Sequence, residues 1–258
     1  MNRLRRAMAA VLPALALAAA AGVCGARAHD DGPACGAPAE LLEAGVPLPA
    51  TARAVAAGAL RIVVVGSASV LGPGTSRPAA AWPARLEALL SAKHPGLKVE
   101  TVVRGAPGLT ATDGAAIIGE ELKRAPTHLV IWQTGAVETA RNLDLDELAA
   151  TLDAGLRRVD AAGADAVLID PQFSRVLRAN ANVEPYREAM RLAAAANNAP
   201  LVRRYDLMHA WAEAEKVDLE RAPRSGRVAA TDRLNDCLAK AIAAVLASGI
   251  EEAQPQKQ

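Results

Sequence analysis

The stretch Arg61-Ile62-Val63-Val64-Val65-Gly66-Ser67-Ala68-Ser69 decides the fold class of this chain. Its first five residues form a nearly continuous β-branched run, which is typical of a parallel strand buried on both faces. The small residues that follow indicate a tight turn out of the strand. Because ligands of parallel sheets bind outside the carboxyl ends of the strands, the loop Gly66–Ser69 is the first place to expect a functional site.

Four more apolar runs alternate with helical patterns along the rest of the chain. Strands are predicted at Lys98–Val103, His128–Trp132, Asp165–Asp170 and Pro200–Tyr205. Helices are predicted at Trp82–Lys93, Thr112–Arg124, Leu145–Ala162, Val183–Asn197 and about Asp236–Ser248. The third helix has an apolar stripe formed by Leu145, Leu148, Leu152, Leu156 and Val159. This alternation predicts right-handed crossovers and an α/β fold, a doubly wound, flavodoxin-like α/β/α sandwich with a five-stranded parallel sheet.

The composition excludes one class of partner and favours an aliphatic core. The chain is 52% hydrophobic but only 2% aromatic, as expected for a sheet covered by helices. It carries 29 basic and 28 acidic residues, so it presents no strong field that would attract nucleic acid. We therefore expect no nucleic-acid partner.

The first residues have the order of a secretory signal. The basic segment Arg3–Arg6 precedes the charge-free run Ala7–Val23, and Ala26-Arg27-Ala28 resembles a cleavage site. We expect cleavage after Ala28 and a periplasmic or secreted protein with no transmembrane segment in its mature form. An uncleaved anchor and lipidation at Cys24 are the alternatives.

The chain divides into four parts by composition. Residues 1–28 are the expected signal peptide, and residues 29–59, rich in Ala, Pro and Gly, form a lead-in that wraps the domain. Residues 60–248 form one α/β domain, and residues 249–258 are a polar tail.

Two cysteines remain after the expected cleavage, Cys35 and Cys237. In an oxidising compartment an isolated pair is interpreted as one disulfide, here joining the lead-in to the last helix. Two unrelated buried thiols are the alternative.

Several motifs, in order, resemble those of the SGNH/GDSL hydrolases, in particular an exported bacterial branch. Gly66-Ser67-Ala68-Ser69 matches the nucleophile loop, and Ala81-Trp82-Pro83-Ala84-Arg85-Leu86 matches the segment that follows it. Arg104–Gly108 resembles the second block of the family and Val130–Gly135 the third. Asp170-Pro171-Gln172 follows the fourth strand, and Cys237-Leu238-Ala239 lies in the last helix. The resemblance covers nearly all of residues 35–247 and implies the family's fold.

The resemblance also implies a serine nucleophile, an oxyanion hole and a closing Asp-x-x-His block, and this chain departs from each. Ala68 stands at the nucleophile position and Val137 at that of the oxyanion asparagine. The closing block becomes Asp232-Arg233-Leu234-Asn235, followed by an apparent deletion before Cys237. An amide cannot take up a proton near neutral pH, so Asn235 cannot replace the histidine. Of the family's set, Asp232 and the backbone donor of Gly108 remain.

Other residues offer weak substitutes. Ser67 and Ser69 flank Ala68, but neighbours on a turn point in different directions. His29, His94 and His128 are predicted away from the carboxyl ends of the strands, and His209 is interpreted as a helix-surface histidine. Glu138 is interpreted as a solvated loop acid, with a ligand contact as the alternative. No cofactor is implied, and no set of residues has metal-ligand spacing.

The sequence therefore favours a non-catalytic, exported member of the SGNH fold with a binding or scaffold role in the cell envelope. Its partner would be an acyl or glycan ligand or an envelope protein, and the sequence leaves the oligomeric state open. The residues expected to line the cleft are Gly66, Ser67, Ser69, Gly108, Gln133 and Gln172. The alternative is an active esterase or acetyltransferase, acting on envelope carbohydrate or lipid esters with a rearranged site.

Overall fold

The computed structural model of the protein describes residues 33–254. The expected signal peptide, residues 1–28, lies outside the described residues, as do the first residues of the lead-in and the last residues of the tail. Within the described part, no helix is both long and apolar enough to cross a bilayer.

One parallel sheet organises the domain. Its five strands follow the order β2-β1-β3-β4-β5, and every pair of neighbours is parallel. The strands are β1 (Ala59–Ser67), β2 (Lys98–Ala106), β3 (Leu129–Gln133), β4 (Asp165–Ile169) and β5 (Leu201–Val202). The predicted doubly wound α/β/α sandwich is thereby confirmed.

Two of the strand expectations need correction. Strand β2 is only half-buried rather than covered on both faces, because it is an edge strand with β1 as its sole neighbour. Strand β5 is two residues long, although Pro200–Tyr205 was expected. The chain leaves the sheet at Arg203, whose backbone is no longer extended, and helix α8 (Arg204–Glu213) begins at the next residue. Adjacent arginines do not fit the interior of a buried strand.

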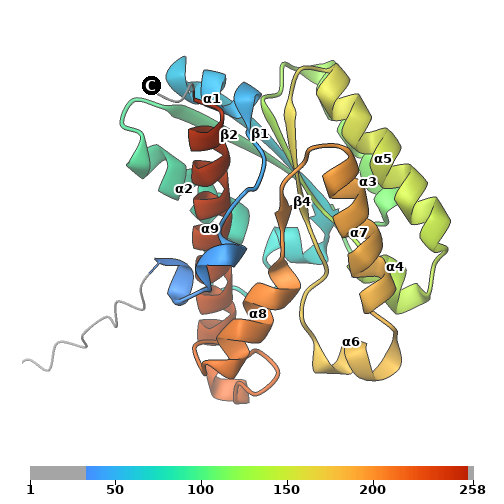
Figure 1. Ribbon diagram of the computed structural model, residues 1–258. Helices are drawn as coiled ribbons and strands as arrows, with labels where there is room; N and C mark the ends of the chain where they lie inside the picture. Colours follow the sequence, from blue (N-terminus) through green and yellow to red (C-terminus); the bar gives the residue numbers. More distant parts are fainter. Residues whose placement is uncertain (1–32, 255–258) are drawn as a thin grey trace, which may run out of the picture. The chain divides into compact units, whose positions relative to one another are not determined.

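Helices cover both faces of the sheet (Figure 1). One face packs against α1 (Pro49–Ala56), α2 (Trp82–Lys93), α8 and α9 (Arg227–Glu252). The other packs against α3 (Ala111–Arg124), α5 (Leu145–Ala161) and α7 (Glu184–Ala196). Two six-residue helices, α4 (Ala136–Arg141) and α6 (Arg175–Asn180), follow β3 and β4, and both are too short to leave a periodic pattern in the sequence.

Alternation along β1 separates the two cores. Ile62 and Val64 enter the core under α2 and α9, whereas Val63 and Val65 enter the core under α3 and α5. The stripe predicted on α5 is also found, because Leu148, Leu152, Leu156 and Val159 are all buried.

Helix α9 is longer than the expected Asp236–Ser248. It runs from Arg227 to Glu252, so the segment Asp232–Asn235 lies inside a helix. The lead-in packs against this helix, since Leu48 donates its backbone N–H to the Gly249 carbonyl oxygen. It also contacts α8, where Trp211 donates from its indole to the Ala34 carbonyl oxygen.

The disulfide between Cys35 and Cys237 is present. It joins the short 3₁₀ helix η1 (Pro33–Cys35) to α9, with the two Cα atoms 5.5 Å apart and both side chains buried. The bond closes a loop with a sequence separation of 202, which restricts the unfolded chain strongly.

Loss of this bond is expected to destabilise the protein. The double substitution of Cys35→Ala and Cys237→Ala should lower the free energy of unfolding by about 2–5 kcal/mol, because the unfolded chain regains loop entropy. Urea unfolding of both proteins, with reductant added to the wild type as a second comparison, measures the difference. Equal unfolding midpoints would contradict the structural role of the bond.

Candidate functional site

The loop after β1 is fixed by one valine side chain. Residues Ala68–Leu71 form the 3₁₀ helix η3, and Val70 is buried against two neighbouring strands. A Cβ atom at Gly66 would lie 2.8 Å from Val70 Cγ1, and one at Gly105 would lie 2.5 Å from Val70 Cγ2. Both positions must therefore be glycine, and the fit holds Ser67, Ala68 and Ser69 at the end of β1.

The Ser69 hydroxyl accepts hydrogen bonds from residues at the carboxyl ends of two other strands. Gln133, the last residue of β3, donates from Nε2 to Ser69 Oγ at 2.5 Å. Arg204, the first residue of α8, donates from Nη1 to the same oxygen at 3.2 Å. The hydroxyl oxygen thus accepts two hydrogen bonds from groups that follow β3 and β5.

Arg204 brings a buried positive charge to this position. Its side chain is 5% exposed, and Nη2 donates to Gln172 Oε1 at 3.3 Å. Burial lowers the pKa of Arg204 to about 10, an effect that the field of Asp170 partly offsets. The guanidinium remains charged at neutral pH, and its hydrogen-bonded partners among the described residues are neutral.

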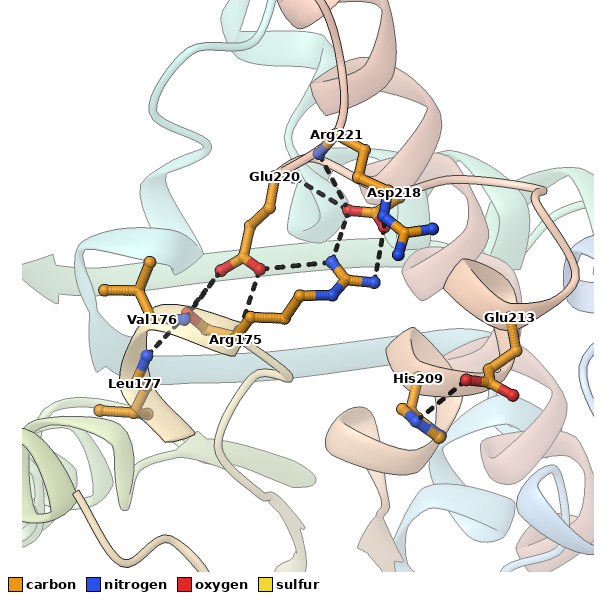
Figure 2. Close-up of polar contacts among 9 residues, drawn as sticks. Arg175, Val176, Leu177, His209, Glu213, Asp218, Glu220 and Arg221 are labelled. Atoms are coloured by element: carbon orange, nitrogen blue, oxygen red, sulfur yellow. Dashed lines mark hydrogen bonds and ion pairs between the residues drawn. The ribbon is translucent and has the colours of Figure 1, made fainter. Parts of the chain in front are cut away.

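A clasp of hydrogen bonds and ion pairs, drawn in Figure 2, holds the start of α6 in place, and Gln172 precedes this helix in the sequence. The Glu220 carboxylate accepts hydrogen bonds from Ser174 Oγ at 2.7 Å and from the backbone N–H of Arg175 at 2.9 Å. The Arg175 guanidinium in turn pairs with Asp218 at 2.9 Å. These contacts tie the start of α6 to the loop between α8 and α9 and so fix the connection from β4.

Asp170 directly follows β4, and it completes the cluster formed with Ser69, Gln133, Gln172 and Arg204. It is 1% exposed, and its oxygens accept hydrogen bonds from the Tyr205 backbone N–H at 2.9 Å and Arg187 Nε at 3.2 Å. Burial raises the pKa of Asp170 to about 6, although these hydrogen bonds and the Arg187 charge act in the opposite direction.

Gly108 lies in the turn after β2, and Val137 lies in α4. Gly108 has φ +76°, and a Cβ atom there would lie 2.6 Å from Arg141 Nη2. The guanidinium of Arg141, on α4, therefore lies directly against Gly108. Val137 is half-buried on the same helix and offers no polar atom beyond its backbone.

Glu138 is not the solvated loop acid that was expected. It is 3% exposed, and its two carboxylate oxygens accept the backbone N–H groups of Gly135 at 2.9 Å and Ala111 at 2.5 Å. Its charge satisfies donors at the starts of α4 and α3, which is a structural role.

Asp232 and Asn235 hold neighbouring elements together from α9. Asp232 accepts hydrogen bonds from the backbone N–H and the hydroxyl of Ser76, at 2.9 and 2.5 Å. These bonds lower the pKa of Asp232. Asn235 Oδ1 accepts the Trp82 backbone N–H at 2.9 Å, and its Nδ2 donates to the Thr231 carbonyl oxygen at 2.9 Å. Oδ1 thus joins α2 to α9, and Nδ2 is used in a bond to the preceding turn of α9 itself.

The three histidines within the described residues lie where the sequence places them. His209 is on α8 with a side chain 45% exposed, 3.5 Å from Glu213 (Figure 2), and its ring packs against Phe173. It is a helix-surface histidine, as predicted. His128 accepts the Arg61 backbone N–H at 2.9 Å near the amino end of β3. His94 ends α2, before β2 begins, and His29 is outside the described residues.

Known proteins share both the sequence pattern and the fold of this chain. Residues 34–252 match the Non-GDSL lipase-like family. The chain belongs to this family. The match covers nearly the whole described domain, and the resemblance to SGNH/GDSL hydrolases is thereby confirmed. Among curated proteins, no sequence matches the chain.

Solved structures share the fold at low sequence identity. LAE5, an α/β hydrolase from the metagenome of Lake Arreo, Spain, is 18% identical with a TM-score of 0.56, over 72% of this chain and 96% of its own. TesA is 20% identical with a TM-score of 0.54, over 69% and 94%. AlinE4, an SGNH-hydrolase family esterase, is 21% identical with a TM-score of 0.50, over 60% and 80%.

The structure brings together three of the expected cleft residues, Ser69, Gln133 and Gln172, and adds Arg204 between them. Nothing in the family motifs marks Arg204. One sequence feature could have indicated it. Arg203 and Arg204 stand at the end of a run expected to be a buried strand, and a charged residue buried at such a position often has a functional or structural role. Across the described range, no three His, Cys, Asp or Glu side chains are grouped as metal ligands.

Loss of the hydrogen bond between Asn235 and Trp82 should lower the stability of the protein measurably. Asn235→Ala leaves the Trp82 N–H, at the start of α2, without its acceptor and should lower the free energy of unfolding by about 1–2 kcal/mol. Asn180→Ala, at an exposed position, is the matched control and should change it by less than about 0.5 kcal/mol. An Asn235 variant as stable as the control would contradict this role.

Asp170 should make stability depend on pH. Its pKa is raised in the folded protein, so between about pH 4 and pH 6 the folded state holds a proton that the unfolded state has released. The free energy of unfolding of the wild type should therefore fall, relative to Asp170→Asn, by about 2–3 kcal/mol as the pH rises through this window. Denaturant unfolding at several pH values tests the sign. A relative gain in stability would show that the Arg187 pair dominates.

Proposed function

We propose that this protein is a non-catalytic member of its family with a binding or scaffold role in the cell envelope. The observation that carries the proposal is the environment of Ser69. Its oxygen accepts hydrogen bonds from an amide and a guanidinium, and neither donor group can take up the proton of an attacking hydroxyl.

The other family positions support the same reading. Ala68 has no hydroxyl and Val137 no side-chain donor, so an acyl intermediate would have neither its attachment point nor its side-chain oxyanion donor. Asn235 lies in α9 with both polar atoms bonded. A histidine at that position would replace a contact between α2 and α9, so restoring the residue type would not restore a base.

We also propose that the protein is exported to the periplasm or secreted, as one domain over residues 60–248 preceded by a lead-in. The basic, apolar and Ala-x-Ala segments at residues 3–28 support this, and so does the disulfide, since such bonds persist in oxidising compartments. Intact-mass measurement of the exported protein should give a chain that begins at His29, whereas a mass that includes residues 1–28 would contradict it.

One observation favours the second candidate, an active esterase or acetyltransferase. Ser69 is half-buried at the end of β1, next to the family's nucleophile position, and donors hold its hydroxyl in place. This reading requires a base that approaches Ser69 only with substrate.

An activity assay separates the two candidates. The protein should hydrolyse neither p-nitrophenyl acetate nor the butyrate above a denatured control, and a fluorophosphonate probe should not label it. Ala68→Ser alone should give no activity, because Asn235, at the family's base position, is an amide that cannot take up the hydroxyl proton. The triple variant of Ala68→Ser, Val137→Asn and Asn235→His should also stay inactive.

A working SGNH esterase assayed in parallel is the positive control. Any residual rate should be below the roughly 10³–10⁴-fold enhancement over water that serine hydrolases keep without their triad, because a side-chain oxyanion donor is missing as well. Turnover by the unmodified protein that disappears in Ser67→Ala or Ser69→Ala would contradict the proposal and establish the second candidate.

A further inference from the structure

Arg204 is a buried cation whose hydrogen bonds go to neutral groups. Its two hydrogen bonds reach Ser69 and Gln172, and within the described chain no carboxylate forms an ion pair with it. The nearest candidate, Asp170, directs its oxygens to the Tyr205 backbone and to Arg187 instead. Burying a charge without a bonded counter-charge is costly, so this arrangement calls for an explanation.

Two buried polar atoms beside Ser69 lack partners among residues 33–254. They are the Nε donor of Arg204 and the Oε1 acceptor of Gln133, whose side chains belong to residues 5% and 3% exposed. Each atom is only two covalent bonds from the nitrogen that donates to Ser69 Oγ. A donor and an acceptor, both unsatisfied, therefore lie close to the same hydroxyl group.

We propose that Arg204, Gln133 and Ser69 bind a hydroxycarboxylate, a ligand in which a carboxylate and a hydroxyl lie on adjacent carbons. The proposal rests on the proposed non-catalytic function, since it names the ligand chemistry of the same site. The carboxylate would accept from the guanidinium and give it a hydrogen-bonded counter-charge in addition to the field of Asp170, as is common for arginine. The ligand hydroxyl would donate to Gln133 Oε1.

The surroundings of the cluster are compatible with entry of a small ligand. Ser69 and Gln172, which bond to the guanidinium, are half-buried residues, whereas Arg204 and Gln133 are buried. The clasp between α6 and the loop at Asp218–Glu220 fixes the Gln172 side of the cluster (Figure 2). Ordered water that bridges the two unsatisfied atoms is the competing explanation, and the experiment is chosen to exclude it.

The test compares glycolate, acetate and ethylene glycol as ligands of the mature protein. Glycolate carries both groups, acetate only the carboxylate and ethylene glycol only hydroxyls. Thermal denaturation at matched ionic strength, with chloride as the reference salt, should show the largest stabilisation with glycolate and a smaller one with acetate. Titration calorimetry should give a dissociation constant for glycolate about tenfold lower than that for acetate, as one buried hydrogen bond predicts.

Two variants test separately the contact of the ligand with Arg204 and its contact with Gln133. Arg204→Met should raise the dissociation constant for both acids by tenfold or more, whereas Arg191→Met, which removes a surface charge on α7, should leave them unchanged. Gln133→Met keeps the guanidinium and should remove the preference for glycolate over acetate while acetate still binds. This second variant carries the test if Arg204→Met does not fold.

The outcomes separate this inference from the proposed function. Equal thermal shifts with glycolate, acetate and chloride would overturn the inference, and solvent would then be what completes the hydrogen bonds of Arg204. If the protein also fails to hydrolyse esters, the non-catalytic function still stands. Ester turnover that Ser69→Ala abolishes, together with selective glycolate binding, would overturn the proposed function and leave the ligand site supported.

Discussion

The burial of β1 on both faces is the constraint on which the rest of the domain depends. This strand pairs along its whole length with β2 and along five residues with β3, and its side chains enter both cores. The chain can leave such a strand only at its end, where Gly66 and Gly105 allow Val70 to pack against the sheet. The position of Ser69 follows from that packing.

The ends of the other strands complete the arrangement around this hydroxyl. Gln133 ends β3, Gln172 follows β4, and Arg204 follows the short β5. The Gln133 amide and the buried guanidinium both bond to one serine, and the Gln172 amide bonds to the guanidinium. The segment that should carry the closing histidine has become part of α9, where Asp232 and Asn235 bond to the loop before α2 and to its first turn. The family's fold is retained, and Asp232 and Asn235 hold α9 against α2 and the loop before it.

Much of this could be predicted from the sequence, for reasons that differ between elements. Buried strands such as β3 and amphipathic helices such as α5 leave strong periodic patterns, and the two cysteines that remain after the expected cleavage pair as their isolation implies. The length of α9 was missed because its first turns carry polar residues that resemble a loop. Arg204 and Glu138 were missed because burial of a charged side chain depends on partners that are distant along the chain, such as Ser69 and the Ala111 N–H.

The central claim is that the Ser69 hydroxyl is held as a hydrogen-bond acceptor and does not act as a nucleophile. Intact-protein mass spectrometry tests it most directly, after the protein is mixed with excess p-nitrophenyl acetate and quenched in acid at short times. The account predicts an unchanged mass at every time point. A gain equal to one acetyl group, mapped by peptide analysis to Ser67 or Ser69, would contradict it.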